Sequence, residues 1–440
     1  MKINQSNRGD FQTVVLIISG VLILAAVLIF SGIIPGFGGI GGKNVVKTDL
    51  VIWGTAPKDV FSKALGDFNQ AYPKNYSLTY VEHNPGSYEQ DLLEALAAGT
   101  GPDIFMINQQ MIAKQKNKIF VWPTQYYTER SFKDAFADDA ELFWQPNGAL
   151  ALPIFIDPLV LYWNKELFAS KGIAQPPTTW EEFQNVSKQL TSLDKNGNIA
   201  FSGAAMGLFT NINNAKDIIS ALILQTGNPI INQDQGKLVS ALSDRASQDA
   251  VTGAMDFFTR FSNVRFDAYS WNYAMPNSTD VFTAGNLAMY LGFGSETGNI
   301  KGKNPHLNFD LAVIPQLGSQ NLHTTMSNVY ALAISKNISA AKLPGAMGAL
   351  LIFTGPDFLK DLAESNSFAP SRRDLLAQEP ASAEKAVLYK SAVLARSWPD
   401  PDPQQTYSIF KEMVESIVSG KRKPSDAVGD MQLKFKTLTQ

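Results

Sequence analysis

The sequence LVIWGTAPKDVFSKALGDFNQAYPKNYSLTYVEHNPGSYEQDLLEALAAGTGPDIFMI (residues 50–107) alternates two kinds of segment. The run at 50–53 and the run after Asp103 in 103–107 are short and continuously apolar, which suits buried strands, and 77–81 is rich in strand-forming residues. Between these runs, apolar residues recur at helical spacing. Strand, helix, strand, helix and strand in this order favour a parallel sheet with right-handed crossovers.

The same alternation continues through the rest of the chain. Strand-like runs recur at 159–163, 309–314 and 330–334, and a capping box opens a helix at 178–182. An amphipathic helix is predicted over 410–418. The residues alone therefore predict an α/β protein with at least two domains.

The composition argues against several classes of function. The 37 basic and 40 acidic side chains leave a net charge of −3, so no global field attracts nucleic acid. The chain has no cysteine, which removes disulfides, cysteine-based metal sites and thiol nucleophiles. The three histidines, His83, His306 and His323, are too far apart in sequence for a local metal motif. We therefore expect no metal, no cofactor and no nucleic-acid partner.

The N-terminus predicts a membrane segment. Residues 14–34 contain no charge, and about 20 helical residues span a bilayer. Lys2 and Arg8 precede the segment, so the positive-inside rule keeps residues 1–10 in the cytoplasm. We expect a single-pass transmembrane anchor at 11–34, a Gly-rich tether at 35–48 and everything later on the extracytoplasmic side. A cleaved signal peptide, cut near the weak small-x-small site at Gly36, stays as an alternative.

Several motifs occur in a fixed order. They are VIWG (51–54), YEQDLLEALAAGTGPD (88–103), LPIFIDPLVLYWNKELF (152–168), FTAGNLAM (282–289) and VIP (313–315). In this order and spacing, over roughly 49–435, the chain resembles the extracellular solute-binding proteins of the maltose-binding type, the receptors of sugar ABC importers.

The resemblance implies a two-lobe fold of the periplasmic-binding-protein type (type II), each lobe being a sheet flanked by helices. Lobe one would comprise 49–153 and 316–367, and lobe two 158–312 and 371–440, with the crossings between these ranges. The ligand, a mono- or oligosaccharide, would lie in the cleft and pass to the permease subunits of the importer. We expect a monomer.

The first candidate site residues come from the strand ends and the hinge. A sugar needs planar donors and acceptors beside aromatic platforms. Asp157 lies in the hinge motif, where relatives often carry an acidic cleft residue, and its alternative role is a cap beside Pro158. Trp53, Asn108 and Gln109 end two predicted strands at the edge where open α/β sheets bind ligands. Core packing for Trp53 and loop solvation for the two amides are the alternatives.

The second set of candidates follows the later motifs. Phe293 and Ser295 lie where relatives place cleft residues. Trp271 is a candidate stacking platform, with packing in the core or on the surface as its alternative. The further members of this set are Trp271, Asn272, Ser327, Asn328, Trp398 and Tyr407.

Other functions stay open at this stage. An anchored sensor without an importer would need the same cleft. A carbohydrate-active enzyme would need two carboxylates flanking the bond, and the sequence cannot pair them in space. The chain has no G-x-S-x-G, Walker A or H-E-x-x-H motif, so we expect no catalytic residues. A ligand other than a sugar, such as a polyol or a polyamine, is a further alternative.

Overall fold

The computed structural model describes residues 47–234, 237–242, 244–318 and 322–439. The expected membrane anchor at 11–34 lies outside these ranges, as does the tether apart from its last two residues. Within the described ranges, no helix combines the length and the apolarity that crossing a bilayer requires.

The predicted alternation of strands and helices at the start of the chain is confirmed. β1 (Thr48–Gly54) lies between β2 (Tyr76–Glu82) and β3 (Ile104–Asn108) and runs parallel to both. α2 (Lys58–Ala71) and α3 (Tyr88–Ala98) are the crossovers, and both bury apolar residues at helical spacing. The three-strand unit is therefore a parallel sheet with helical connections.

One long strand, β6 (Leu152–Asn164), joins this unit to the rest of the molecule. The first half of β6 pairs antiparallel with β13 (Ser327–Ile334), which also pairs with β3. The second half pairs with β11 (Leu287–Phe293) and β12 (Phe309–Val313). The further strands of the sheet are β7 (Ser192–Leu193), β8 (Ile199–Ala204) and β14 (Ala369–Pro370). Within the described residues, ten strands thus form one sheet ordered β2-β1-β3-β13-β6-β11-β8-β7, with β12 and β14 also on β6.

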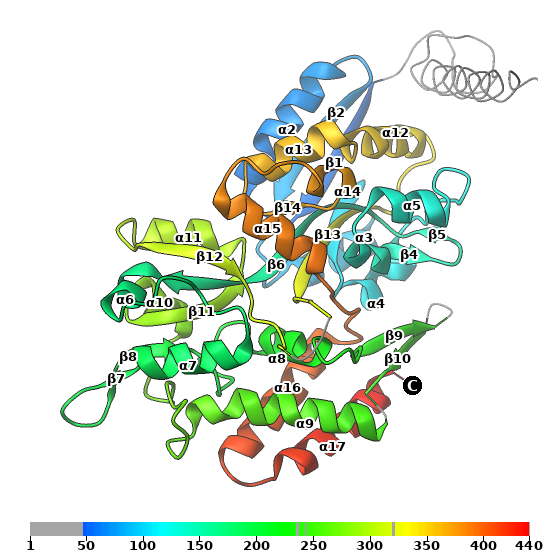
Figure 1. Cartoon of the computed structure of the whole chain (residues 1–440). Coiled ribbons are helices and arrows are strands. Elements are labelled where there is room, and N and C mark those ends of the chain that lie inside the picture. The colour runs from blue at the N-terminus through cyan, green and yellow to red at the C-terminus, as the bar shows by residue number, and fades with distance from the viewer. Residues whose placement is uncertain (1–46, 235–236, 243, 319–321, 440) are drawn as a thin grey trace, which may run out of the picture.

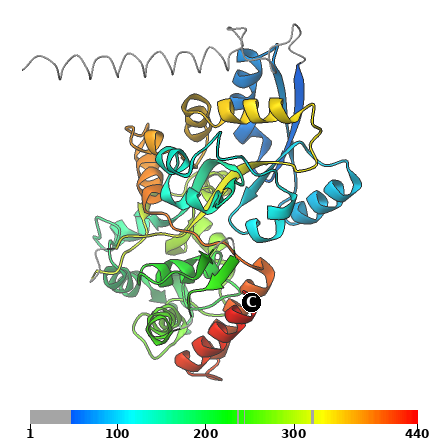
Figure 2. The same ribbon diagram turned by 90° about the vertical axis from the view of Figure 1, so that its right-hand side faces the viewer.

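The elements around the first half of β6 form one lobe and those around its second half form another, and the two lobes lie one above the other in Figures 1 and 2. The upper lobe carries β1, β2, β3 and β13, and the lower lobe carries β8 and β11. The long helices of the upper lobe, besides α2 and α3, are α12 (Leu343–Phe353) and α13 (Pro356–Glu364). Those of the lower lobe are α7 (Trp180–Leu190), α8 (Ala215–Leu224), α9 (Arg245–Thr259), α16 (Pro403–Val418) and α17 (Pro424–Leu438). The two-lobe α/β architecture is the one that the sequence predicts.

The short elements fill the connections. The helices are α4 (Ile112–Gln115), α5 (Glu129–Ala135), α6 (Lys165–Ser170), α10 (Ser278–Thr283), α11 (Glu296–Lys303), α14 (Arg373–Leu376), η1 (Lys116–Lys118), η2 (Asp138–Phe143) and η3 (Arg260–Ser262). The strands are β4 (Trp144–Gln145), β5 (Gly148–Ala149), β9 (Ile231–Asp234) and β10 (Lys237–Ser240).

The segment that follows β14 packs beside α5. The N–H of Ala137 donates to the carbonyl of Ser371 at 2.8 Å, and α14 contacts α5, so this segment packs against the upper lobe. α15 (Ala383–Leu394) then packs on β6 and β12, and residues 395–402 lead to α16. The predicted lobe bounds stay a prediction, but these contacts place residues 371–376 beside α5.

Candidate functional site

A cavity of about 630 Å³ lies beside the middle of β6, where the two lobes meet. Its volume falls within the roughly 300–1,000 Å³ that is usual for small-molecule sites. Polar side chains dominate its walls. The lining residues are Asp157, Asn213, Asn214, Asp217, Asn277, Thr279, Asp280, Phe293, Ser295, Glu296, Asn299, Lys303, Asn328 and Tyr330.

A second cavity, of about 230 Å³, lies on the upper lobe. It is lined by residues that follow β1 and β3 and by the start of α3, and Tyr330 belongs to both cavities. The lining residues are Thr55, Pro85, Tyr88, Glu89, Met106, Ile107, Asn108, Gln110, Met111 and Tyr330. The two cavities therefore meet at β13, and one ligand could contact both lobes there.

Asp157 occupies the centre of the hinge strand. Only 2% of the residue is exposed, and its Oδ1 accepts the N–H of Ser295 at 2.9 Å. Burial, with a smaller contribution from the nearby Glu296, raises the pKa of this carboxyl from its ordinary 3.8 to about 7, while the hydrogen bonds from Ser295 oppose the shift. Asp157 therefore changes its charge near neutral pH and offers a strong acceptor when ionised.

The raised pKa of Asp157 predicts a pH-dependent stability. The folded protein holds the proton of Asp157 more tightly than the unfolded chain does. The stabilisation that this proton gives to the folded state is therefore full below pH 3.8 and is lost as the pH rises through 7. We therefore compare the free energy of unfolding of Asp157→Asn with that of the wild type. At about 1.4 kcal/mol per pKa unit, the difference (variant minus wild type) should be about 2–3 kcal/mol larger at pH 8 than at pH 5. Urea unfolding at the two pH values measures this difference. The exposed Asp249→Asn is the control, and a difference for Asp157→Asn that does not vary with pH would refute the assignment.

Glu296 holds the lower wall of the cavity together. Its Oε1 accepts the N–H of Phe293 at 2.8 Å and the Nδ2 of Asn214 at 2.7 Å, and its Oε2 accepts the hydroxyl of Tyr290 at 2.5 Å. Burial raises the pKa of this carboxyl, although these donors oppose the shift. Asn214 has a φ of 59°, a left-handed conformation that asparagine tolerates better than most residues. Glu296 thus ties the start of α8 to the start of α11.

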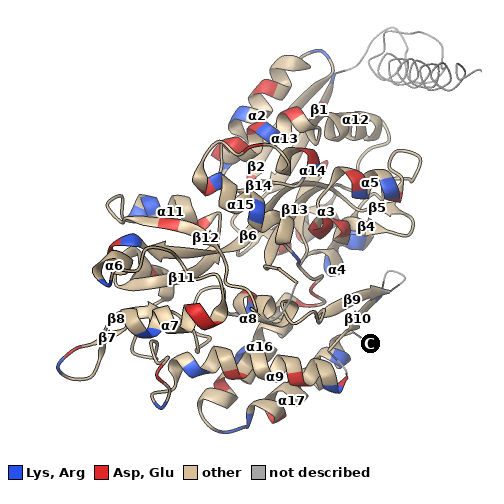
Figure 3. Cartoon of the chain, in the orientation of Figure 1, with Lys and Arg blue, Asp and Glu red and all other residues tan. Residues whose placement is uncertain are grey.

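Asp217 and the Asp280–Lys303 pair complete the charges of the cavity. Asp217 lies in the first turn of α8, and burial raises its pKa to about 6, with Lys216 opposing the shift. Lys303 Nζ lies 3.2 Å from Asp280 Oδ1, and both side chains are exposed at the rim. Elsewhere, Lys and Arg are interspersed with Asp and Glu over both lobes (Figure 3). The cavity therefore presents mainly acceptors and neutral amides.

The structure brings five predicted site residues to these cavities. Asp157, Phe293, Ser295 and Asn328 line the larger cavity, and Asn108 lines the smaller one. They come from β6, from the end of β11, from β13 and from the end of β3. Their role as ligand-binding residues stays a prediction.

Gln109, Ser327 and Trp53 lie near these residues but contact protein groups. Gln109 and Ser327 are completely buried, and both are fully engaged in hydrogen bonds within the protein. The Trp53 ring is half-buried at the end of β1, and its centroid lies 4.1 Å from that of His83. None of the three is among the residues that line the two cavities.

The remaining four candidates lie elsewhere in the lower lobe. Trp271 is completely buried and donates to Asn211, and the side chain of Asn272 bonds Tyr269 within the same loop. Trp398 is buried, and its indole N–H donates to Ser220 of α8 at 3.3 Å. Tyr407 is exposed on α16 and packs on Phe209, with 4.9 Å between the ring centroids. All four side chains thus contact other protein groups.

Sequence reasoning missed most of the polar wall of the larger cavity. The asparagines before α8 and α10 look like ordinary helix caps, and Asn277 is one, because its Oδ1 accepts the N–H of Thr279 at 3.2 Å. The only available signal was the density of asparagine in 211–214. The missed residues are Asn213, Asn214, Asp217, Asn277, Thr279, Asp280, Glu296, Asn299, Lys303 and Tyr330.

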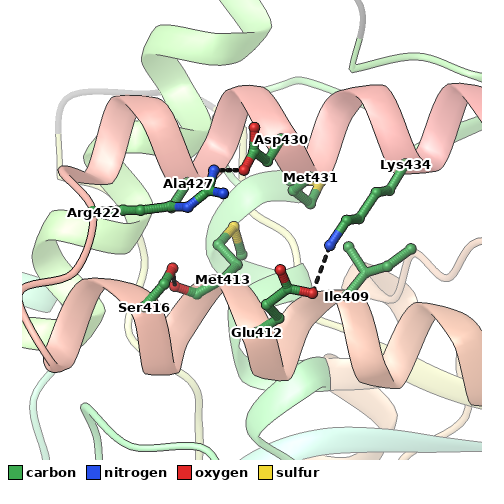
Figure 4. A pocket seen from close by; sticks show the side chains of 9 residues that line it. All are labelled: Ile409, Glu412, Met413, Ser416, Arg422, Ala427, Asp430, Met431 and Lys434. Carbon is green, nitrogen blue, oxygen red and sulfur yellow. Dashed lines mark hydrogen bonds and ion pairs between the residues drawn. The ribbon is translucent and has the colours of Figure 1, made fainter.

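A third pocket, between α16 and α17, is too small for a ligand. Its volume of about 10 Å³ barely admits one water molecule. Figure 4 shows that Lys434 of α17 forms an ion pair with Glu412 of α16, and that Arg422, in the loop between the two helices, pairs with Asp430 of α17. Among the residues that the structure describes, no group of three or more His, Asp or Glu side chains is placed to hold a metal ion.

Comparisons with known proteins agree on one family. The family model of the bacterial extracellular solute-binding proteins matches residues 63–389. The diacetylchitobiose binding protein DasA of Streptomyces coelicolor is 23% identical over 421 residues, which cover 90% of this chain and 91% of that protein.

Two solved structures illustrate the likeness in fold. A cyclo/maltodextrin-binding protein complexed with maltotetraose gives a TM-score of 0.71 at 17% identity and covers 91% of this chain and 98% of its own. The cyclic α-maltosyl-1,6-maltose binding protein of Arthrobacter globiformis gives a TM-score of 0.71 at 15% identity and covers 89% of this chain and 99% of its own. Since the family model covers more than half of the sequence, the chain belongs to the bacterial extracellular solute-binding proteins.

Proposed function

We propose that this chain is the substrate-binding component of an ABC importer and that it holds a carbohydrate between its two lobes. The observation that carries the proposal is the cavity beside β6, where amides, hydroxyls and carboxylates surround Phe293 and Tyr330. Alternating donors and acceptors suit hydroxyl groups, and aromatic rings suit the apolar faces of a sugar. DasA is named for diacetylchitobiose, and the two structural relatives are named for maltodextrins and a cyclic maltosyl sugar.

Binding by lobe closure is the proposed mechanism. A ligand that contacts Asn108 on the upper lobe and Ser295 on the lower lobe makes both contacts only when the lobes are close. It therefore shifts the equilibrium toward the closed form by its difference in affinity for the two forms. The closed form would then deliver the sugar to the permease. The helix expected at 11–34 would hold this monomeric receptor at the extracytoplasmic face of the membrane, where its effective concentration near the permease is high.

We infer that the ligand leaves chemically unchanged. The family is one of solute-binding proteins, and capture needs no general acid or base. Incubation of the full-length protein with a panel of chromogenic glycosides would contradict this inference if any glycoside were turned over and Asp157→Ala abolished the turnover.

A thermal-shift screen tests the proposed ligand class. Maltotetraose, mannobiose and diacetylchitobiose are the first probes, and a sugar present at 100 times its dissociation constant adds about 2.7 kcal/mol to the free energy of unfolding. For a chain of this size we expect the melting temperature to rise by about 3 °C. Spermidine and glycerol are the comparison ligands. A rise with spermidine and with none of the sugars would contradict a carbohydrate site.

A further inference from the structure

The side chain of Gln109 uses every hydrogen-bonding atom that it has. Its Oε1 accepts the N–H of Val329 at 3.1 Å. Its Nε2 donates to the carbonyl of Ser327 at 3.2 Å and to the Oδ1 of Asn328 at 2.8 Å. Gln109 is also completely buried, so nothing of it is left for a ligand.

Two of these partners fix which way the amide of Gln109 points. The N–H of Val329 can only donate, and the carbonyl of Ser327 can only accept. A reversed Gln109 amide would bring two donors together at Val329 and two acceptors together at Ser327. Nε2 of Gln109 must therefore face Asn328, and Asn328 must accept this hydrogen bond with its Oδ1.

The consequence for Asn328 concerns the cavity. Asn328 lines the cavity, and its Oδ1 is taken by Gln109, so Nδ2 is the amide atom that remains for a ligand. Asn328 also pairs with Asp157 between β13 and β6, and directly opposed side chains of antiparallel strands lie on the same face. A fixed donor and a carboxylate acceptor thus stand side by side at the hinge.

We propose that Gln109 is a positioning residue that locks Asn328 as a hydrogen-bond donor toward the cavity. The site then selects a ligand that accepts from Asn328 and donates to Asp157, as one sugar hydroxyl or two neighbouring hydroxyls can. An ammonium group has no acceptor, so the same geometry disfavours polyamines. This inference rests on the proposed function for the identity of the ligand, whereas the orientation of Asn328 is independent of it.

The first test needs no sugar. The full-length protein is labelled with ¹⁵N-asparagine, and the side-chain signal of Asn328 is assigned as the one that Asn328→Asp removes. Both N–H protons of Asn328 should exchange rapidly with water, because Nδ2 has no hydrogen-bond acceptor among the residues that the structure describes. In Gln109→Glu the carboxylate accepts from Nδ2 instead, the amide of Asn328 turns round, and its exchange should slow. Slow exchange in the wild type would overturn the proposal, even if Gln109→Glu failed to fold.

The second test measures binding of maltotetraose, mannobiose and diacetylchitobiose by calorimetry in a double-mutant cycle. Asn328→Ala should weaken binding about tenfold, which corresponds to one lost hydrogen bond. Gln109→Met should weaken binding in the wild type, yet have no further effect in the Asn328→Ala background. A merely structural role for Gln109 would lower affinity equally in both backgrounds and would overturn the proposal. If none of these sugars binds to the wild type while Asn328 exchanges as expected, the carbohydrate assignment fails and the positioning role stands.

Discussion

Replacing Asp157 by alanine is expected to weaken sugar binding by about 10–100-fold at pH 8, measured with the sugar that raises the melting temperature most. Asp157 lines the cavity, and its carboxylate is ionised at that pH because its pKa is about 7. A hydrogen bond to a charged group contributes about 1.5–3 kcal/mol, and 1.4 kcal/mol is tenfold in affinity. Isothermal titration calorimetry measures the change.

The controls for Asp157→Ala separate binding from folding. Asp249→Ala removes an exposed carboxylate on α9 and should leave the affinity unchanged. Urea unfolding of Asp157→Ala at pH 8 checks that the variant is folded under the conditions of the binding measurement. A change in affinity of less than about threefold at pH 8 would contradict the placement of Asp157 in the site.

The largest loss of stability is expected for Lys216→Met. Lys216 forms a buried ion pair with Asp400, of which only 1% is exposed, and its Nζ lies 5.0 Å from the centroid of Trp398. Thr406 donates at 2.7 Å to Oδ2 of Asp400, the oxygen that Lys216 also contacts. Methionine would leave Asp400 buried without its cation, which costs about 3–5 kcal/mol. Urea unfolding measures this loss.

Two further variants show whether the unpaired charge causes the loss. Adding Asp400→Asn to Lys216→Met removes the stranded charge and should recover more than half of the lost free energy of unfolding. Lys188→Met breaks an exposed ion pair with Asp267 and should change the free energy of unfolding far less, because water screens exposed charges. Equal losses for Lys216→Met and Lys188→Met would contradict the importance of burial.

The fold could be predicted because its signals are local. The apolar runs that became β1 and β3 and the helical spacing of α2 are properties of short segments, and burial in a sheet follows from them. The packing of residues 371–376 on α5 could not be predicted this way, because it is a contact between segments more than 200 positions apart in the sequence.

The site was harder to predict because it depends on which face each side chain takes. Asn328 and Gln109 both looked like polar residues at strand ends, but only Asn328 lines the cavity, while Gln109 is buried behind it. Trp271 and Trp398 stand in polar, turn-rich sequence that suggests exposure. In the structure both are buried, and their indole N–H groups donate to Asn211 and Ser220, which are distant in the sequence.

The shared strand β6 also limits how the length of this chain can vary in evolution. Its thirteen residues place alternate side chains on opposite faces, from the upper lobe through Asp157 to Tyr162, whose hydroxyl donates to the carbonyl of Phe293 at 2.6 Å. One residue inserted after Asp157 would carry every later side chain of the strand to the wrong face. Insertions and deletions among descendants of this chain should therefore collect in surface turns such as 194–198, and the strand at the hinge should keep its length.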